Sequence, residues 1–133
     1  MSVTLCNQTI TTPITGYVTS AVEGFGDVTA LTVVAQFVTM GGGATVDLWV
    51  QTTVDQGATW IDIANFHWTT SSAAQAVNLS GLVSITAPAA ILDGGLAANT
   101  VREGILGDRF RCKLTSTGTY AGGTRATVSV SAR

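Results

Sequence analysis

The sequence predicts an all-β protein, an antiparallel β-sandwich of jelly-roll or immunoglobulin-like type with about seven or eight short strands. Three observations favour this fold. Several segments alternate apolar and polar residues with the period of two that is typical of strands. Turns rich in glycine and polar residues separate these segments. No segment has the apolar stripe of a three-turn helix. The 133 residues suffice for a single domain with a sizeable core.

The N-terminal residues 1–15 are polar and strand-prone, and Pro13 interrupts them. They fit either an edge strand or an arm that lies on a neighbouring subunit. We therefore treat residues 1–15 as an arm or edge strand and residues 16–133 as the sandwich domain. A long strand is predicted over residues 29–40, and its apolar residues on both faces predict burial on both sides.

The most strongly patterned stretch is a β-hairpin predicted over residues 44–68. In its first arm, Val46, Leu48 and Val50 alternate with residues of the opposite face. The two faces separate less cleanly in the second arm, which predicts a bulge or burial on both sides.

Between the two arms, residues 53–60 have the sequence TVDQGATW, which resembles the Asp-box hairpin of sialidase-type propellers and other β proteins. Hydroxyl, carboxylate and glycine at this spacing fold a turn: the carboxylate accepts local hydrogen bonds and glycine adopts a positive φ. We expect a structural role, with surface recognition as the alternative, for Thr53, Asp55, Gly57, Thr59 and Trp60.

The second half of the chain has one clear hairpin, formed by residues 109–115 and 124–132. Short strands are also predicted at residues 76–79 and 83–87, and a brief helical turn at 89–92. Residues 88–108 lack clean periodicity, and their length suggests an excursion across one end of the fold.

Charge is distributed unevenly along the chain. The first 101 residues contain six acidic and no basic residues, whereas the last 32 contain six basic and two acidic ones. Such a chain could dock onto a neighbour, acidic side to basic side, or its basic strands could lie beside acidic ones within one domain. For docking, the predicted assembly interface is the basic set Arg109, Arg111, Lys113 and Arg125.

Few residues have the types and spacing of a catalytic or metal-binding site. We therefore expect no enzyme, no metal site and no cofactor. His67 is the only histidine, and no nucleophile motif accompanies it. Cys6 and Cys112 lack the CxxC spacing of zinc or redox motifs, so free thiols are expected. A net charge of −2 with one lysine argues against nucleic-acid binding, and no apolar run is long enough to span a membrane.

Only 11% of the residues are charged, while 46% are hydrophobic. A chain of this composition is expected to cover part of its surface with a partner, unless its Thr and Ser hydroxyls alone keep it in solution. The first residues lack a signal-peptide pattern, so synthesis in the cytoplasm is expected.

Three stretches, LWVQTTVDQGATWIDIANF, ILGDRFRCKLTSTGTY and TRATVSVSAR, together resemble small β-sandwich virion proteins of tailed double-stranded-DNA bacteriophages. The resemblance covers roughly residues 29–133, with Gln56 in place of a usual glycine and Cys112 in place of a usual valine. It implies a capsid decoration protein or another head or tail accessory subunit, located in the virion. The implied partners are copies of itself and other virion proteins.

Two other functions remain open at this point. The first is a carbohydrate- or receptor-binding module of a phage fibre or spike, in which exposed aromatic rings stack on a host glycan. Its candidate rings are Trp49, Trp68 and Tyr120. The second and weakest is a hydrolase, which would need a polar cleft with an acid neighbour around His67.

Overall fold

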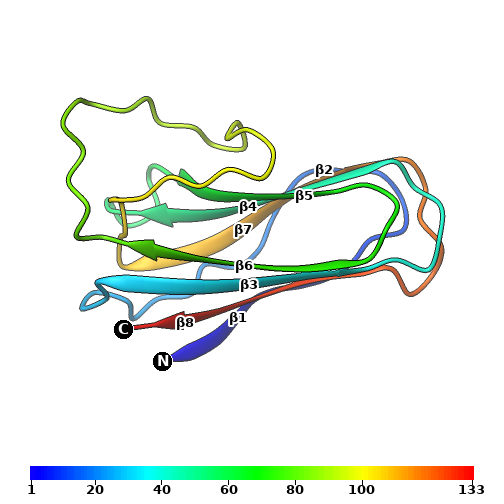
Figure 1. Cartoon of the computed structure of the whole chain (residues 1–133), viewed down its shortest axis with the longest axis horizontal. Helices are drawn as coiled ribbons and strands as arrows, with labels where there is room; N and C mark the ends of the chain where they lie inside the picture. Colours follow the sequence, from blue (N-terminus) through cyan, green and yellow to red (C-terminus); the bar gives the residue numbers. More distant parts are fainter.

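A computed structural model, which describes all 133 residues, confirms the antiparallel β-sandwich. Two four-stranded sheets pack face to face, in the orders β1-β8-β3-β6 and β2-β7-β4-β5 (Figure 1). No helix is present, and hence none that is long and apolar enough to cross a membrane. The strands are β1 (Ser2–Thr9), β2 (Ile14–Val18), β3 (Ala30–Val38), β4 (Thr45–Thr53), β5 (Ile61–Trp68), β6 (Ala73–Ser80), β7 (Arg109–Thr117) and β8 (Arg125–Ala132).

One cluster of 24 buried residues fills the space between the sheets, so both sheets belong to a single folding unit. Alternation supplies this core: every second side chain of β3, β7 and β8 points inward. The prediction that β3 is buried on both faces is wrong. Val34 and Val38 on its outer face are 39% and 45% exposed, because nothing packs on that side of the sheet.

Strands β4 and β5 contain the irregularity that the sequence predicts. Val50 lies opposite Ala64, but the next residue, Gln51, lies opposite Asp62, which leaves Ile63 as the extra residue of a bulge. Ile63 and Ala64 are therefore both buried, while Asp62 lies beside Gln51. Both faces of these two strands are covered, by the core on one side and by a loop on the other.

The N-terminal segment is an integral part of the sandwich. Strand β1 is an edge strand that pairs with β8, and Leu5 and Cys6 belong to the core. Of the two alternatives for residues 1–15, the structure shows the edge strand and no separate arm. The expected boundary between residues 15 and 16 falls inside β2, which is the edge strand of the other sheet.

The long connection between β6 and β7, residues 81–108, is named the β6–β7 loop below. It contains neither the strand predicted at residues 83–87 nor the helical turn predicted at 89–92. The loop leaves the end of β6, runs outward, and returns over β5 and β4 before β7 begins (Figure 1). Residues 88–108 therefore belong to a long excursion across one end of the fold, as their lack of periodicity predicts.

Candidate functional site

The β6–β7 loop continues one sheet beyond its edge strand. Backbone hydrogen bonds join Asp62 N to Leu92 O at 2.8 Å, Asn65 N to Thr100 O at 2.9 Å, and Arg102 N to Ile63 O at 2.8 Å. The loop thereby pairs with the free edge of β5. This edge, which would otherwise expose unpaired backbone groups, is closed by the chain itself.

A buried carboxylate fixes the next part of the loop. The oxygens of Asp62 accept hydrogen bonds of 2.8 to 3.0 Å from the backbone N–H groups of Gly94, Gly95 and Leu96. The fourth donor is the side-chain amide of Gln51, whose bond measures 2.8 Å. Successive N–H groups that converge on one point form an anion-binding nest. Here the protein's own carboxylate occupies the nest, so the nest is a structural clamp.

Two further contacts hold the same segment against the sheet. The indole nitrogen of Trp49 donates a hydrogen bond of 2.9 Å to the carbonyl of Leu96. The backbone N–H of Asn99 donates to Asn65 Oδ1 at 2.9 Å, and Asn99 Oδ1 accepts from the backbone N–H of His67 at 3.0 Å. The outer face of β4 and β5 is consequently buried beneath the loop.

The basic residues of β7 are engaged in holding this loop as well. Asp93 Oδ1 lies 3.1 Å from Lys113 Nζ and 3.9 Å from an Arg111 nitrogen, and it accepts a hydrogen bond of 2.6 Å from Gln51. Burial acts to raise the pKa of Asp93, but the hydrogen bonds from Gln51 and Lys113 and the two positive charges outweigh it, so the pKa lies below its usual range. Arg111 also stacks on Trp60, 4.2 Å from the ring centroid.

The four basic residues predicted as an assembly interface do not form one face. Arg109, Arg111 and Lys113 lie on β7, whereas Arg125 lies on β8 of the opposite sheet. Arg109 pairs with Glu23 at 3.1 Å, just as Arg111 and Lys113 pair with Asp93. Of the two explanations for the uneven charge along the chain, these three residues follow the intramolecular one. Among the four, only Arg125 is exposed and without an ionic partner.

The expectation of exposed aromatic platforms is wrong for all three candidate rings. Trp49, Trp68 and Tyr120 are 9%, 4% and 2% exposed. Trp49 lies beneath the loop, Trp68 stacks on Phe37 with 5.3 Å between ring centroids, and the Tyr120 hydroxyl donates a hydrogen bond of 2.6 Å to the carbonyl of Thr69. These rings pack the interior and leave no stacking surface for a sugar.

The Asp-box turn has the hydrogen bonds expected for it. Asp55 Oδ1 accepts from the Thr53 hydroxyl and from the backbone N–H of Thr59, each at 2.8 Å, and the N–H of Gly57 donates to the Thr53 hydroxyl at 2.9 Å. Gly57 has a φ of 94°. The bonds from Thr59 and Thr53 lower the pKa of Asp55. All these contacts are internal to the turn.

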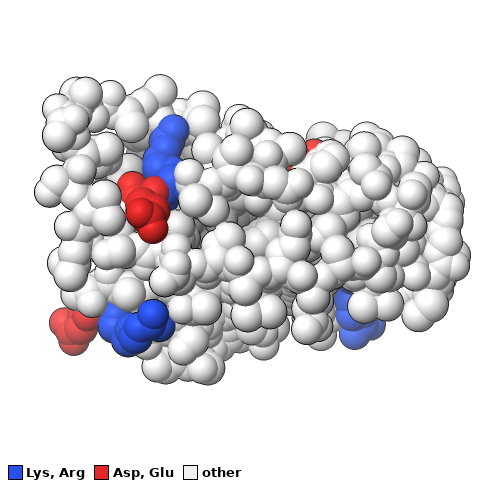
Figure 2. Space-filling model, viewed as in Figure 1, with Lys and Arg blue, Asp and Glu red and all other residues white.

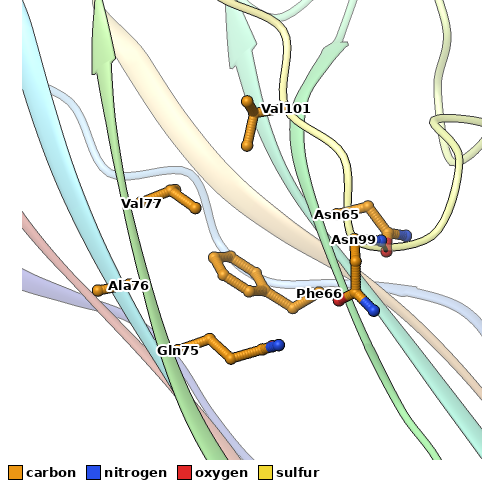
Figure 3. A pocket seen from close by; sticks show the side chains of 7 residues that line it. All are labelled: Asn65, Phe66, Gln75, Ala76, Val77, Asn99 and Val101. Carbon is orange, nitrogen blue, oxygen red and sulfur yellow. Dashed lines mark hydrogen bonds between the residues drawn. The ribbon is translucent and has the colours of Figure 1, made fainter.

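A groove opens between β5 and β6, the edge strands of the two sheets. Figure 3 shows the ring of Phe66 in this gap, between the strands, and Val101 of the β6–β7 loop beside it. The groove has a volume of about 320 Å³ and no ionisable side chain among its lining residues, which are Asn65, Phe66, Gln75, Ala76, Val77, Asn99 and Val101. It therefore offers contact surface without groups for acid–base chemistry.

His67 has an acid neighbour, as a hydrolase would need. Its Nδ1 lies 2.9 Å from Asp47 Oδ1, and Asp47 also accepts a bond of 3.3 Å from the Asn65 amide. No serine, threonine or cysteine side chain is hydrogen-bonded to the imidazole. The pair is a polar contact on the outer face of β4 and β5.

The β6–β7 loop carries five of the twelve exposed large apolar side chains of the molecule. We name this set the loop patch; its exposed fractions run from 44% to 77%, and its members are Leu82, Val83, Ile85, Ile91 and Val101. Two hydrogen bonds tie the outgoing limb of the loop to the returning limb, Gly104 N to Ser80 O at 2.9 Å and an Arg102 nitrogen to Ala90 O at 2.6 Å. The segment that bears Leu82, Val83 and Ile85 is thus tied at both of its ends.

Charged side chains are sparse over the surface around these elements. In Figure 2 they gather mainly toward the end that holds the β6–β7 loop and the chain termini, and most of the face shown is uncharged. No group of three or more His, Cys, Asp or Glu side chains is placed to hold a metal ion.

No protein-family model matches the chain, and no match is found among curated proteins or solved structures.

Sequence reasoning did not identify Asp62 and Asp93 as the residues that position the loop. A weak signal was present: Gln51 and Asp62 are polar residues inside strands that are otherwise apolar, and Gly94 and Gly95 follow Asp93 directly. Asp62 and the two glycines are more than 30 residues apart, and the alternation of apolar and polar residues gives no information about contacts over that distance.

Proposed function

We propose that this protein is a structural subunit of a tailed bacteriophage particle, a capsid decoration protein or another head or tail accessory protein. It acts by protein–protein assembly, and the loop patch is its contact surface. The observation that carries the proposal is that five large apolar side chains project into solvent from a loop whose backbone is clamped by Asp62. Exposed apolar groups on an ordered frame are typical of protein interaction sites.

Three other features support assembly. The contact surface is preorganised, because the loop is hydrogen-bonded to β5 and to Asp62 before any partner arrives. The neighbouring edge strand β6 (Ala73–Ser80) contains no charged residue and no proline, the usual devices that keep an edge from pairing with another chain. The sequence resemblance to phage β-sandwich proteins points in the same direction.

The test is to purify particles made from the genome that encodes this chain and to ask whether the chain is part of them. We expect it in gradient-purified particles by mass spectrometry, and as ordered density by electron microscopy. A triple variant, Leu82→Ser, Ile85→Ser and Ile91→Ser, should be lost from the particles. Val54→Ser is the matched control, since Val54 is 66% exposed but lies on the Asp-box turn.

Circular dichroism and thermal melting of the isolated variants check that they fold, because all four positions are exposed in the wild-type protein. Absence of the chain from purified particles would overturn the proposal. Incorporation of the triple variant at the wild-type level would remove the loop patch from it.

A further inference from the structure

The two cysteines, 106 positions apart in the sequence, both belong to the hydrophobic core. Cys6 lies on β1 and Cys112 on β7, so they come from opposite sheets. Both face inward, and their exposed fractions are 2% and 0%. Both are free thiols in this structure.

The two strands approach each other closely at this place. Facing sheets usually lie about 10 Å apart, but β1 and β7 make the most extensive close approach between the sheets, with Cα atoms within 8 Å. The register of β1 shifts between Thr4 and Cys6, and this bulge buries both Leu5 and Cys6. The Cys6 thiol donates a hydrogen bond of 3.9 Å to the carbonyl of Ala126, and each cysteine affects the pKa of the other, as expected for two thiols that lie side by side.

We propose that Cys6 and Cys112 form a disulfide between the two sheets when the protein is exposed to oxidising conditions. The oxidant is a small disulfide such as oxidised glutathione. The inference does not depend on the proposed function, because it rests only on the core. A disulfide needs Cα atoms about 4.4–6.8 Å apart with side chains that point toward each other. The two cysteines face the core from strands of opposite sheets whose Cα atoms come within 8 Å, so a small shift of β1 suffices to form the bond.

The chemistry is a thiol–disulfide exchange in two steps. The Cys6 thiolate attacks one sulfur of oxidised glutathione, which breaks its S–S bond and releases one reduced glutathione. Cys112, as its thiolate, then attacks the Cys6 sulfur of the mixed disulfide and displaces the second. Two electrons pass from the cysteines to the oxidant, and the two thiol protons end on the two glutathione molecules.

The fold assigns different roles to the two thiols. The neighbouring Cys112 side chain lowers the pKa of Cys6, which favours Cys6 as the attacking thiolate, whereas burial raises the pKa of Cys112 well above its usual value. Both are shielded from solvent, so the oxidant reaches Cys6 only when β1 opens. Strand β1 is suited to open, because it pairs with β8 on one side alone.

The experiment compares the purified chain after incubation in oxidised glutathione and in dithiothreitol under native conditions. We expect the oxidised sample to lose two hydrogen atoms in intact mass, to show no titratable thiol after denaturation, and to yield one peptide that links Cys6 to Cys112. Closing so long a loop should raise Tm by roughly 10 °C, and dithiothreitol should reverse the change.

Matched variants keep the test specific. Cys112→Val retains a small apolar side chain in the core and should show neither the mass loss nor the rise in Tm, and Cys6→Ala should behave alike. Wild-type protein that keeps two titratable thiols would overturn the proposal. So would a product that carries only glutathione adducts or intermolecular dimers, or a linked product whose Tm is not raised. The wild-type masses decide the question even if a variant does not fold.

Discussion

The carboxylate of Asp62 accepts a hydrogen bond of 3.0 Å from the backbone N–H of Leu96, which lies 34 residues further along the chain. This bond is one of five, made by four donor groups, that end on a carboxylate with no solvent exposure. Three of the four donors are backbone groups of a loop without secondary structure, so the path of Gly94, Gly95 and Leu96 is set by this side chain, together with the other contacts that hold the loop.

Asp62→Ala should lower the free energy of unfolding by about 3 kcal/mol, since it leaves buried N–H groups without acceptors. Urea denaturation followed by circular dichroism measures the change. Amide hydrogen exchange at Gly94, Gly95 and Leu96 should accelerate together. Asp27→Ala is the control, because Asp27 is exposed and makes no side-chain hydrogen bond or ion pair. Equal stability of the two variants would show that the clamp does not hold the loop.

Stability should also fall in acid through Asp93. Its pKa in the folded protein lies below the usual value of 3.8, so the ionised form stabilises the fold above that value and the contribution is lost as the pH falls through the lower folded pKa. Urea midpoints measured between about pH 5 and pH 2 should decline more steeply for the wild type than for Asp93→Asn. Parallel pH profiles would contradict the role of this carboxylate.

Gly107 lies too close to β4 for any side chain. A Cβ built at this position would lie 1.8 Å from the carbonyl oxygen of Thr53. Gly107→Ala should therefore cost at least about 2 kcal/mol, because the loop must shift away from the strand. Gly122→Ala is the control: it meets nothing within 4 Å and has no positive φ. It should be neutral or stabilising by up to about 1 kcal/mol. If Gly107→Ala and Gly122→Ala unfolded at the same temperature, the loop would have to lie further from β4 than the structure shows.

Strand β1 should contribute to the stability of the isolated chain. Leu5 is 4% exposed and belongs to the core, so Leu5→Ala should cost about 3 kcal/mol. Asn7→Ala, two positions on and exposed, should change the urea midpoint little. If the segment were an arm that orders only on a neighbour, both variants would unfold at the wild-type midpoint.

Local sequence predicted most of the strands and the sandwich. The hairpin predicted for residues 109–115 and 124–132 is wrong, because β7 and β8 are strands of opposite sheets. The alternation in β7 and β8 and the hairpin of β4 and β5 specify which side chains face the core, because a period of two has only one arrangement on a pleated strand. The Asp-box turn was equally predictable, since Thr53, Asp55 and Gly57 contact one another within five residues. The bulge was predictable as well, because apolar and polar residues do not alternate regularly around Ile63.

The tertiary structure alone decided what covers the outer face of β4 and β5. From the sequence, Trp49 is a candidate exposed ring on the outer face of its strand, and Lys113 is a basic residue whose partner, within the domain or on a neighbour, stays open. In the fold both lie against the β6–β7 loop, Trp49 bonded to Leu96 and Lys113 paired with Asp93. The sequence likewise does not show that Cys6 and Cys112 lie on strands that approach each other. The periodicity of side chains shows which residues of a strand share a face. It does not show which distant segments of the chain come together in the fold, and these contacts join such segments.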